Sequence, residues 1–162
     1  MPPPGVTLRP ITPEDAALLG RIYASTRTEE LAPLPWTQAQ KAAFLQSQFE
    51  AQHAHYQRHY AGAAFSVVER AGVPVGRLYL HRSAGELRIV DISLLPEQRG
   101  TGLGEALLRE VQEQARASGR RVGIHVERHN RARRLYERLG FHVAADDGGI
   151  YLRMEWAPPP LS

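Results

Sequence analysis

Apolar residues in the first third of the chain recur at three- and four-residue intervals, which is typical of amphipathic helices. A short strand is expected at residues 6–9. The segment 12–15, Thr-Pro-Glu-Asp, predicts a helix start with Thr12 at the N-cap, proline at the first helical position and acids in the first turn. Prolines at 33–35 interrupt the pattern. A second, longer helix is expected over residues 37–60.

The pattern then changes to segments rich in β-branched and aromatic residues, which favour strands. Three such segments are residues 64–69, 75–80 and 87–94. Ala71-Gly72 and Ala84-Gly85 separate them and have turn character. We therefore expect an antiparallel meander.

The remaining third of the chain alternates between the two patterns. Gly119 is placed to end a helix whose apolar residues repeat at three and four. The interpretation is a single α+β domain over residues 1–162, an α/β/α sandwich around a mixed sheet, with loose proline-rich ends at 1–5 and 157–162. The expected elements are a helix at 103–118, a strand at 121–126, a short helix at 131–139 and closing strands at 141–144 and 150–156.

Composition limits the class of protein. The 162 residues are 43% hydrophobic and 23% charged, as in ordinary globular domains. With no cysteine, disulfides, thiolate nucleophiles and cysteine-ligated metal centres are excluded. No apolar run reaches the ~20 residues that span a bilayer. The start has neither the charged nor the apolar region of a secretory signal, so we expect a cytoplasmic protein.

The positive charge is almost entirely arginine. The net charge is +3, and Lys41 is the only lysine. Arginine suits bidentate contact with phosphate or carboxylate, so an anionic ligand is plausible. Five arginines gather near residues 128–138, but no aromatic residues interleave them as in nucleic-acid-binding modules. We expect part of this cluster to face ligand phosphates, and we expect no nucleic acid or membrane partner.

The most informative segment is Pro96-Glu-Gln-Arg-Gly-Thr-Gly-Leu-Gly104, between an expected strand and an expected helix. Three glycines at alternate positions let the backbone turn tightly and approach a ligand. The helix that follows offers unpaired N–H groups and the positive end of its dipole. Together these features predict a phosphate site, with Arg99 at its edge.

Two nucleotide-binding loops are excluded by spacing. A P-loop needs Gly-Lys-Ser/Thr, and Leu103-Gly104-Glu105 supplies neither the lysine nor the hydroxyl. A dinucleotide fingerprint starting at Gly100 needs a glycine where Glu105 stands. On its own, the loop is equally compatible with an ordinary turn before a helix.

A second motif favours the phosphate site over an ordinary turn. Segment 96–104 resembles motif A of the GNAT superfamily of acyl-CoA N-acyltransferases, Arg/Gln-x-x-Gly-x-Gly/Ala, through Arg99, Gly102 and Gly104. Some thirty residues later, Asn130-Arg-Ala-Arg-Arg-Leu-Tyr-Glu-Arg-Leu-Gly-Phe141 resembles motif B. The start Leu8-Arg-Pro-Ile-Thr-Pro-Glu-Asp15 is also similar, so the resemblance spans most of the chain.

The resemblance implies a mostly antiparallel sheet with a splayed central strand, and transfer of an acetyl group from acetyl-CoA to an amine without a metal. The acceptor would be a small molecule or a protein, and a homodimer is a possible assembly. The implied cofactor-binding residues are Ile92 and Leu94 for the pantetheine arm, Arg99, Gly100, Thr101, Gly102, Leu103 and Gly104 for the pyrophosphate, and Asn130 for the arm.

The resemblance also places Tyr136 where the family protonates the leaving thiolate. A tyrosine in a packed core is the alternative for this residue. An alkylamine with a pKa near 10.4 costs about 4.6 kcal/mol to deprotonate at pH 7, so a base or water must help. The position that often carries a glutamate in the family holds Arg88 here, which cannot be a base. Glu86, Asp91 or a water-mediated route remain candidates.

Several alternatives stay open. The spacing of His55 and His59 could hold zinc, but no third ligand is evident and a solvated helix face is expected for these residues and His53. A non-catalytic acyl-CoA-binding module that has lost its base is the second functional hypothesis. Five aromatic residues in or just before the long helix are expected in the core, although some could line the acceptor site: Trp36, Phe44, Phe49, Tyr56 and Tyr60.

Overall fold

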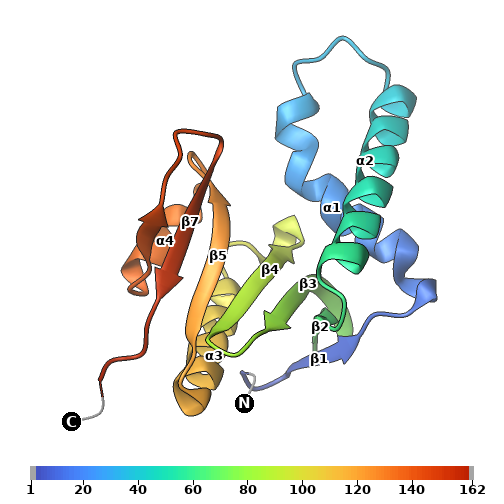
Figure 1. The fold of residues 1–162 in the computed structure, drawn as a ribbon. Helices are drawn as coiled ribbons and strands as arrows, with labels where there is room; N and C mark the ends of the chain where they lie inside the picture. The colour runs from blue at the N-terminus through green and yellow to red at the C-terminus, as the bar shows by residue number, and fades with distance from the viewer. Residues whose placement is uncertain (1–2, 161–162) are drawn as a thin grey trace.

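A twisted sheet forms the middle layer of the computed structural model, which describes residues 3–160 (Figure 1). Within those residues the sheet has seven strands in the order β1-β2-β3-β4-β5-β7-β6. All neighbours are antiparallel except β4 and β5, which are parallel. The strands are β1 (Val6–Pro10), β2 (Ala64–Arg70), β3 (Val73–Arg82), β4 (Glu86–Leu94), β5 (Arg121–Glu127), β6 (His142–Ala145) and β7 (Tyr151–Trp156).

Helices cover both faces of this sheet (Figure 1). One pair forms a long hairpin over β2, β3 and β4, and the other pair packs on the opposite face. The confirmed architecture is thus a mixed α/β sandwich with a mostly antiparallel sheet. The helical elements are η1 (Pro13–Asp15), α1 (Ala16–Leu31), α2 (Gln38–His59), η2 (Pro96–Gln98), α3 (Leu103–Ser118) and α4 (Arg133–Arg138).

The first helical segment begins where the sequence predicts, at Pro13 after the N-cap Thr12. Its first turn is a 3-10 turn, and the Asp15 carboxylate accepts the Thr12 N–H at 2.8 Å to complete a capping box. Arg9 on β1 donates to both oxygens of Asp15 at 2.9 Å. This ion pair fixes the start of the α1–α2 hairpin to the edge of the sheet.

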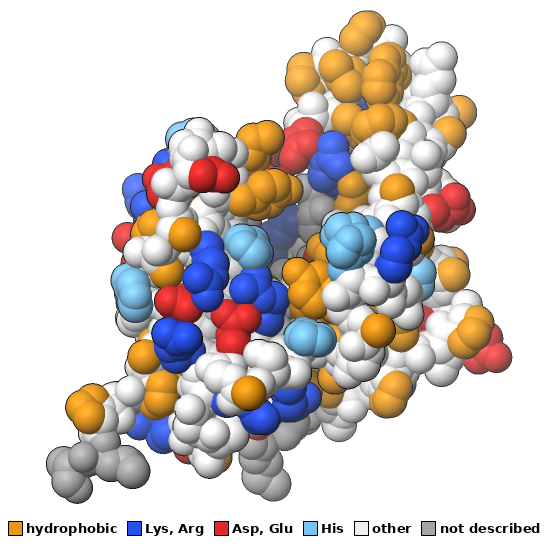
Figure 2. Space-filling model, viewed as in Figure 1, with side chains coloured by type: hydrophobic (Ala, Val, Ile, Leu, Met, Phe, Trp, Pro, Cys, Tyr) orange, Lys and Arg blue, Asp and Glu red, His pale blue; other side chains and the backbone are white. Residues whose placement is uncertain are grey.

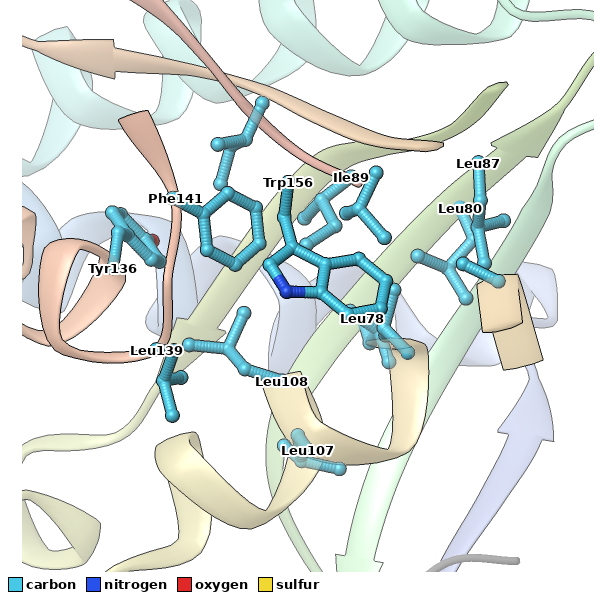
Figure 3. Packing of buried hydrophobic residues seen from close by; sticks show 14 of the residues in the cluster. Leu78, Leu80, Leu87, Ile89, Leu107, Leu108, Tyr136, Leu139, Phe141 and Trp156 are labelled. Atoms are coloured by element: carbon cyan, nitrogen blue, oxygen red, sulfur yellow. The ribbon is translucent and has the colours of Figure 1, made fainter. Parts of the chain in front are cut away.

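The main core lies between the sheet and the α3–α4 face (Figure 3). Val122, Ile124 and Val126 alternate along β5 and all enter it, so the residues between them face the other side of the sheet. Trp156 closes the core at the end of β7. Burying each such aliphatic side chain stabilises the fold by roughly 1.5–3 kcal/mol.

The hairpin of α1 and α2 is less buried than its sequence pattern predicts. Of the 22 residues of α2 only Phe49 is buried, and it forms a small second core with Leu19 and Tyr23. Trp36 is 38% exposed, so its expected place in the core is wrong. Because the hairpin extends beyond the sheet, much of it has nothing to pack against (Figure 1).

The expected loose ends fall partly outside the described residues. The carbonyl groups of Pro3 and Gly5 accept hydrogen bonds from Val6 and Ala71, so residues 3–5 are attached to the sheet. Residues 1–2 and 161–162 lie outside the described part. No helix within residues 3–160 is both long and apolar enough to cross a membrane.

The central strands β4 and β5 separate from each other along their length. They pair only from Glu86 with Arg121 to Ile89 with Ile124. At this point β4 also shifts its register with β3, because Ile89 lies opposite Leu80 while Asp91 lies opposite Tyr79. The extra residue, Val90, is a β-bulge that bends β4 away from β5. The predicted splay of the central strand is therefore present.

Candidate active site

Backbone groups of β4 face the splay without a strand partner. Leu95 N–H donates to the Val75 carbonyl, and the antiparallel alternation then directs the hydrogen-bonding groups of Asp91 and Ser93 toward β3. The N–H and C=O groups of Ile92 and Leu94 consequently point to the β5 side. Pairing of β4 with β5 has already ended at Ile89, so these groups are open to an extended ligand.

The glycine loop continues directly from this edge. Gly100 and Gly102 have φ angles of 76° and 84°, which are strained for any residue with a Cβ. Gly102 is the N-cap of α3, so the first N–H groups of this helix point into the loop. A backbone of this shape, together with the helix dipole, forms an anion site.

Two arginine side chains border the loop, and an asparagine lies in the turn before α4. Arg99 Nη2 reaches the Ser25 carbonyl on α1 at 3.4 Å, which is a long contact that an anion could replace. Arg138 pairs with Glu105, in the first turn of α3, at 2.6 Å. Asn130 lies between β5 and α4, where its Oδ1 accepts the Ala132 N–H at 2.8 Å. The asparagine thus shapes the turn that leads into α4.

Tyr136 is buried on α4 beside Phe141, with ring centroids 5.8 Å apart (Figure 3). Burial, and secondarily the charge of Asp91, raise the pKa of Tyr136 to about 12. Among the described residues, no hydrogen bond to its hydroxyl is present.

Asp91 is the centre of a network on the opposite face of β4. Arg77 on β3, 2% exposed, binds both carboxylate oxygens at 3.1 and 2.9 Å. Ser93 donates to Oδ1 at 2.7 Å, and Tyr56 of α2 donates to Oδ2 at 3.2 Å. Arg77 also donates to Gln52 at 2.8 Å. Both oxygens of Asp91 are therefore already occupied by donors.

Glu86 lies before the splay and belongs to a second network. Its carboxylate accepts from Arg88 at 3.0 Å and from Arg153 of β7 at 3.3 Å. It also lies over Gly123 of β5, where a Cβ would come within 2.9 Å of the Glu86 Cδ. Glu86 and Asp91 thus lie on opposite sides of the bulge and do not form one carboxylate pair.

Arg88 links this network to His125. The Arg88 Nη1 group lies 2.7 Å from Nδ1 of His125. Burial of the ring lowers the pKa of His125, and the charges of Arg88 and Arg153 lower it further. His125 is the first residue of β5 beyond its pairing with β4, and the alternation with Ile124 and Val126 turns it away from the core.

A hollow separates the α1–α2 hairpin from β5 and β7, and basic and histidine side chains gather around it (Figure 2). A different pocket, of about 680 Å³, lies near the start of α1 and is lined by Phe49, His53 and Phe65 among others. None of the splay residues lines that pocket. The two spaces are therefore separate.

Neither the pair of histidines on α2 nor the two carboxylates near the splay have the arrangement of a metal site. His55 and His59 stack with ring centroids 4.0 Å apart on the exposed face of α2. Within residues 3–160 there is no group of three histidine, aspartate or glutamate residues that could hold a metal ion.

The resemblance implied cofactor-binding residues between Ile92 and Gly104 and at Asn130, and the structure places Ile92, Leu94 and the glycine loop along one continuous edge. Sequence reasoning did not identify Arg77 or His125. The sequence did contain an indication for His125, because it alternates with buried Val and Ile residues on β5 and so must lie on the opposite face of the sheet. Tyr56, expected mainly in the core, instead joins α2 to Asp91, and no local pattern could have shown that contact.

Comparison with known proteins agrees with this arrangement. Residues 25–141 match the sequence profile of the acetyltransferase (GNAT) family. No curated protein matches the chain with significance.

Solved structures show the same fold at low sequence identity. The PaiA N-acetyltransferase from Thermoplasma acidophilum, in complex with coenzyme A, has a TM-score of 0.70 at 18% identity over 94% of this chain and 99% of that one. An acetyltransferase from Thermus thermophilus has a TM-score of 0.69 at 20% identity, covering 98% and 100%. The ribosomal-protein-S18-alanine N-acetyltransferase from Escherichia coli has a TM-score of 0.63 at 18% identity, covering 97% and 96%.

Proposed function

Because the chain belongs to the acetyltransferase (GNAT) family, we propose that it transfers an acetyl group from acetyl-CoA to a primary amine. Acyl transfer in general follows from the family. The acetyl donor and the amine acceptor are the proposal, supported by the geometry of the splay and by a structural neighbour that binds coenzyme A.

The observation that carries the proposal is one continuous edge of unpaired backbone groups. Ile92 and Leu94 offer N–H and C=O groups spaced like a strand, and Gly100 and Gly102 then turn the chain so that α3 presents its N-terminus. A pantetheine arm with two amides, followed by a diphosphate, has the matching order of groups. The residues present therefore fit this cosubstrate.

Acetyl-CoA would supply an activated acyl group as a thioester. The acceptor nitrogen attacks the carbonyl carbon, the C–N bond forms and the C–S bond breaks. The nitrogen loses one proton and the sulfur gains one, so the products are an amide and a thiol. A free N–H at the β4 edge donates to the carbonyl oxygen, as an oxyanion hole does.

Tyr136 is the proposed hydrogen-bond donor to the sulfur. A pKa of about 12 lies some 3.5 units above the ~8.5 of a free thiol, so complete proton transfer would be uphill by about 5 kcal/mol. The hydroxyl therefore stabilises the developing charge through a hydrogen bond, and water delivers the proton. The absence of a partner for this hydroxyl among residues 3–160 supports this role.

The proton of the amine needs an acceptor. Asp91 and Glu86 each already accept hydrogen bonds from arginine, so neither is a free carboxylate. We therefore propose water in the hollow as the route, with these carboxylates as positioning groups. The acceptor itself would be a small amine or a protein amine.

The same commitment of Asp91 and Glu86 favours a second candidate, a non-catalytic acyl-CoA-binding module. Calorimetry with acetyl-CoA and a thiol-release assay over a panel of amines separate the two. The proposed enzyme binds acetyl-CoA and releases thiol only when an amine is present. Binding without release for every amine would favour the module, and no binding would exclude both.

Nucleic acid is not proposed as a partner. Within the described residues most arginines of the cluster are paired, Arg128 with Asp146, Arg131 with Glu29 and Arg138 with Glu105. Binding of DNA or RNA with steep dependence on salt would contradict this.

A further inference from the structure

We infer that the acceptor is an α-amino carbonyl compound, recognised by Tyr56 through its amine and by His125 through its neighbouring carbonyl or carboxylate oxygen. The inference rests on the proposed function and names the substrate class of the same site. It follows from which hydrogen-bonding groups the two side chains have left to offer.

Tyr56 offers an acceptor. An ionised carboxylate has no hydrogen to give, so the Tyr56 hydroxyl must donate in its bond to Asp91. Its oxygen keeps lone pairs, which can only accept. An N–H group of an amine is the complementary partner. The ion pair with Arg77 holds the Asp91 carboxylate in place, so the Tyr56 hydroxyl continues to donate its hydrogen to Asp91.

His125 offers a donor. Arg88 has only N–H groups, so the His125 Nδ1 atom 2.7 Å away must accept. In a neutral imidazole the proton is then on Nε2. Burial and the charges of Arg88 and Arg153 lower the pKa of His125, which favours the neutral ring. An oxygen acceptor, neutral or anionic, is the complementary partner of this N–H.

Both groups belong to the same space. Asp91 follows the bulge at the splay, and His125 is the first β5 residue beyond the pairing. Arg88, which contacts His125, and Asp91, which accepts from Tyr56, both lie on the face of β4 opposite the core residues Ile89 and Ile92. The α2 side and the β5–β7 side therefore face each other across the hollow of Figure 2.

The charges near His125 favour an oxygen over a second ammonium. Arg88 and Arg153 approach the ring from β4 and β7, while Glu86 is shared between them. Glu127, farther along β5, has no ion pair within the described residues and is the group that a polycation would prefer. An acceptor with an oxygen next to its amine and a polycationic acceptor are therefore distinguished by the amine that reacts best.

Thiol release from acetyl-CoA should be measured with matched amines: glycine, glycinamide, triglycine, ethylamine and spermidine. We expect kcat/KM, calculated per concentration of the unprotonated amine so that the different amine pKa values cancel, to be at least tenfold higher for glycinamide, triglycine or glycine than for ethylamine. The comparison of glycine with triglycine shows whether the acceptor is a free amino acid or a peptide N-terminus. Equal rates for ethylamine, or preference for spermidine, overturn the inference but leave the proposed function. No release with any amine overturns both.

Variants test the two residues separately. His125→Asn keeps an acceptor near Nδ1 for Arg88 but removes the Nε2 donor, and should abolish most of the preference for glycinamide over ethylamine. His125→Gln restores a donor near Nε2 and should recover part of it. Tyr56→Phe should raise KM for every amine at least fivefold, with acetyl-CoA affinity unchanged by calorimetry. His142→Asn, on exposed β6, is the control. An unchanged preference in folded His125→Asn overturns the assignment.

Discussion

Asp91 and Arg77 form an ion pair with two parallel hydrogen bonds across β3 and β4, Nε to Oδ1 at 3.1 Å and Nη2 to Oδ2 at 2.9 Å. The pair lies directly beside the bulge at Val90 and is capped by Tyr56 from α2. It therefore connects the α1–α2 hairpin to the strand that borders the splay. Arg77 is only 2% exposed, so water cannot take the place of its carboxylate partner.

Removing one member of this pair should be costly. Asp91→Asn leaves the Arg77 charge buried without an opposite charge, and we expect the free energy of unfolding to fall by about 3 kcal/mol. Urea denaturation followed by circular dichroism measures this. The control is Glu29→Gln, which breaks the exposed pair with Arg131 and should cost less than about 0.5 kcal/mol. Similar losses in both variants would contradict a buried, unreplaceable pair.

Gly76 on β3 allows β4 to approach closely. A Cβ at this position would meet the Ser93 carbonyl, and would lie 3.1 Å from the Leu94 Cα. Because these are backbone atoms, Gly76→Ala must displace β4 and should destabilise the protein by about 2 kcal/mol or more, with weaker binding of CoA. Gly85→Ala, with no atom within 4 Å of its Cβ, is the matched control. A Gly76→Ala protein with wild-type unfolding and CoA affinity would disprove the close approach.

Gly102 should matter for the ligand as well as for the fold. Its φ of 84° costs an alanine roughly 1–2 kcal/mol, and Gly5, with a φ of 78°, imposes a similar cost. Both Gly102→Ala and Gly5→Ala should therefore lower the thermal midpoint. Only Gly102→Ala should weaken CoA binding, at least fivefold by calorimetry, because it alone shapes the N-terminus of α3. Equal CoA affinity in the two variants would place the diphosphate elsewhere.

Tyr136→Phe removes a hydroxyl that has no protein partner within residues 3–160, so the folded state should keep its stability. We expect turnover with the best amine to fall about tenfold to a hundredfold, while calorimetric affinity for acetyl-CoA changes less than threefold. Tyr60→Phe is the control. A folded Tyr136→Phe enzyme with full turnover would leave Tyr136 as a core residue.

Two histidines predict a pH dependence of stability. Burial lowers the pKa of His53 and of His125 below 6.5, and positive charges, Arg77 for His53 and chiefly Arg88 for His125, lower it further. Between that lowered value and 6.5 the unfolded chain binds more protons than the folded one, so stability falls as the pH drops from 7 toward 5. His53→Gln should reduce this slope.

The measurement is urea denaturation at pH 7.5, 6.5, 5.5 and 5.0. Carboxyl groups with lowered pKa, such as Asp146 beside Arg128, lose their contribution to stability only at more acidic pH, so they do not account for a change over the measured range. His142→Gln, at an exposed position of β6, serves as the control. An identical slope in wild type and His53→Gln would show that His53 is not coupled to folding.

The sequence by itself determined the elements and the turn of the glycine loop into α3, because these depend on neighbours along the chain. Periodicity located α3 at residues 103–118, and the alternation of glycines predicted the turn into its N-terminus. Thr12 and Asp15 closed a capping box within four residues. Local chemistry of this kind needs no knowledge of the rest of the fold.

Only the tertiary structure decided which side chains remain free at the splay. Glu86 and Asp91 look alike in the sequence, yet arginines distant along the chain, Arg153 and Arg77, occupy both of them. The proton on His125 is likewise set by Arg88, 37 positions away. Hydrogen bonds between strands that are remote in sequence depend on register and bulges, and these are properties of the assembled sheet rather than of any segment.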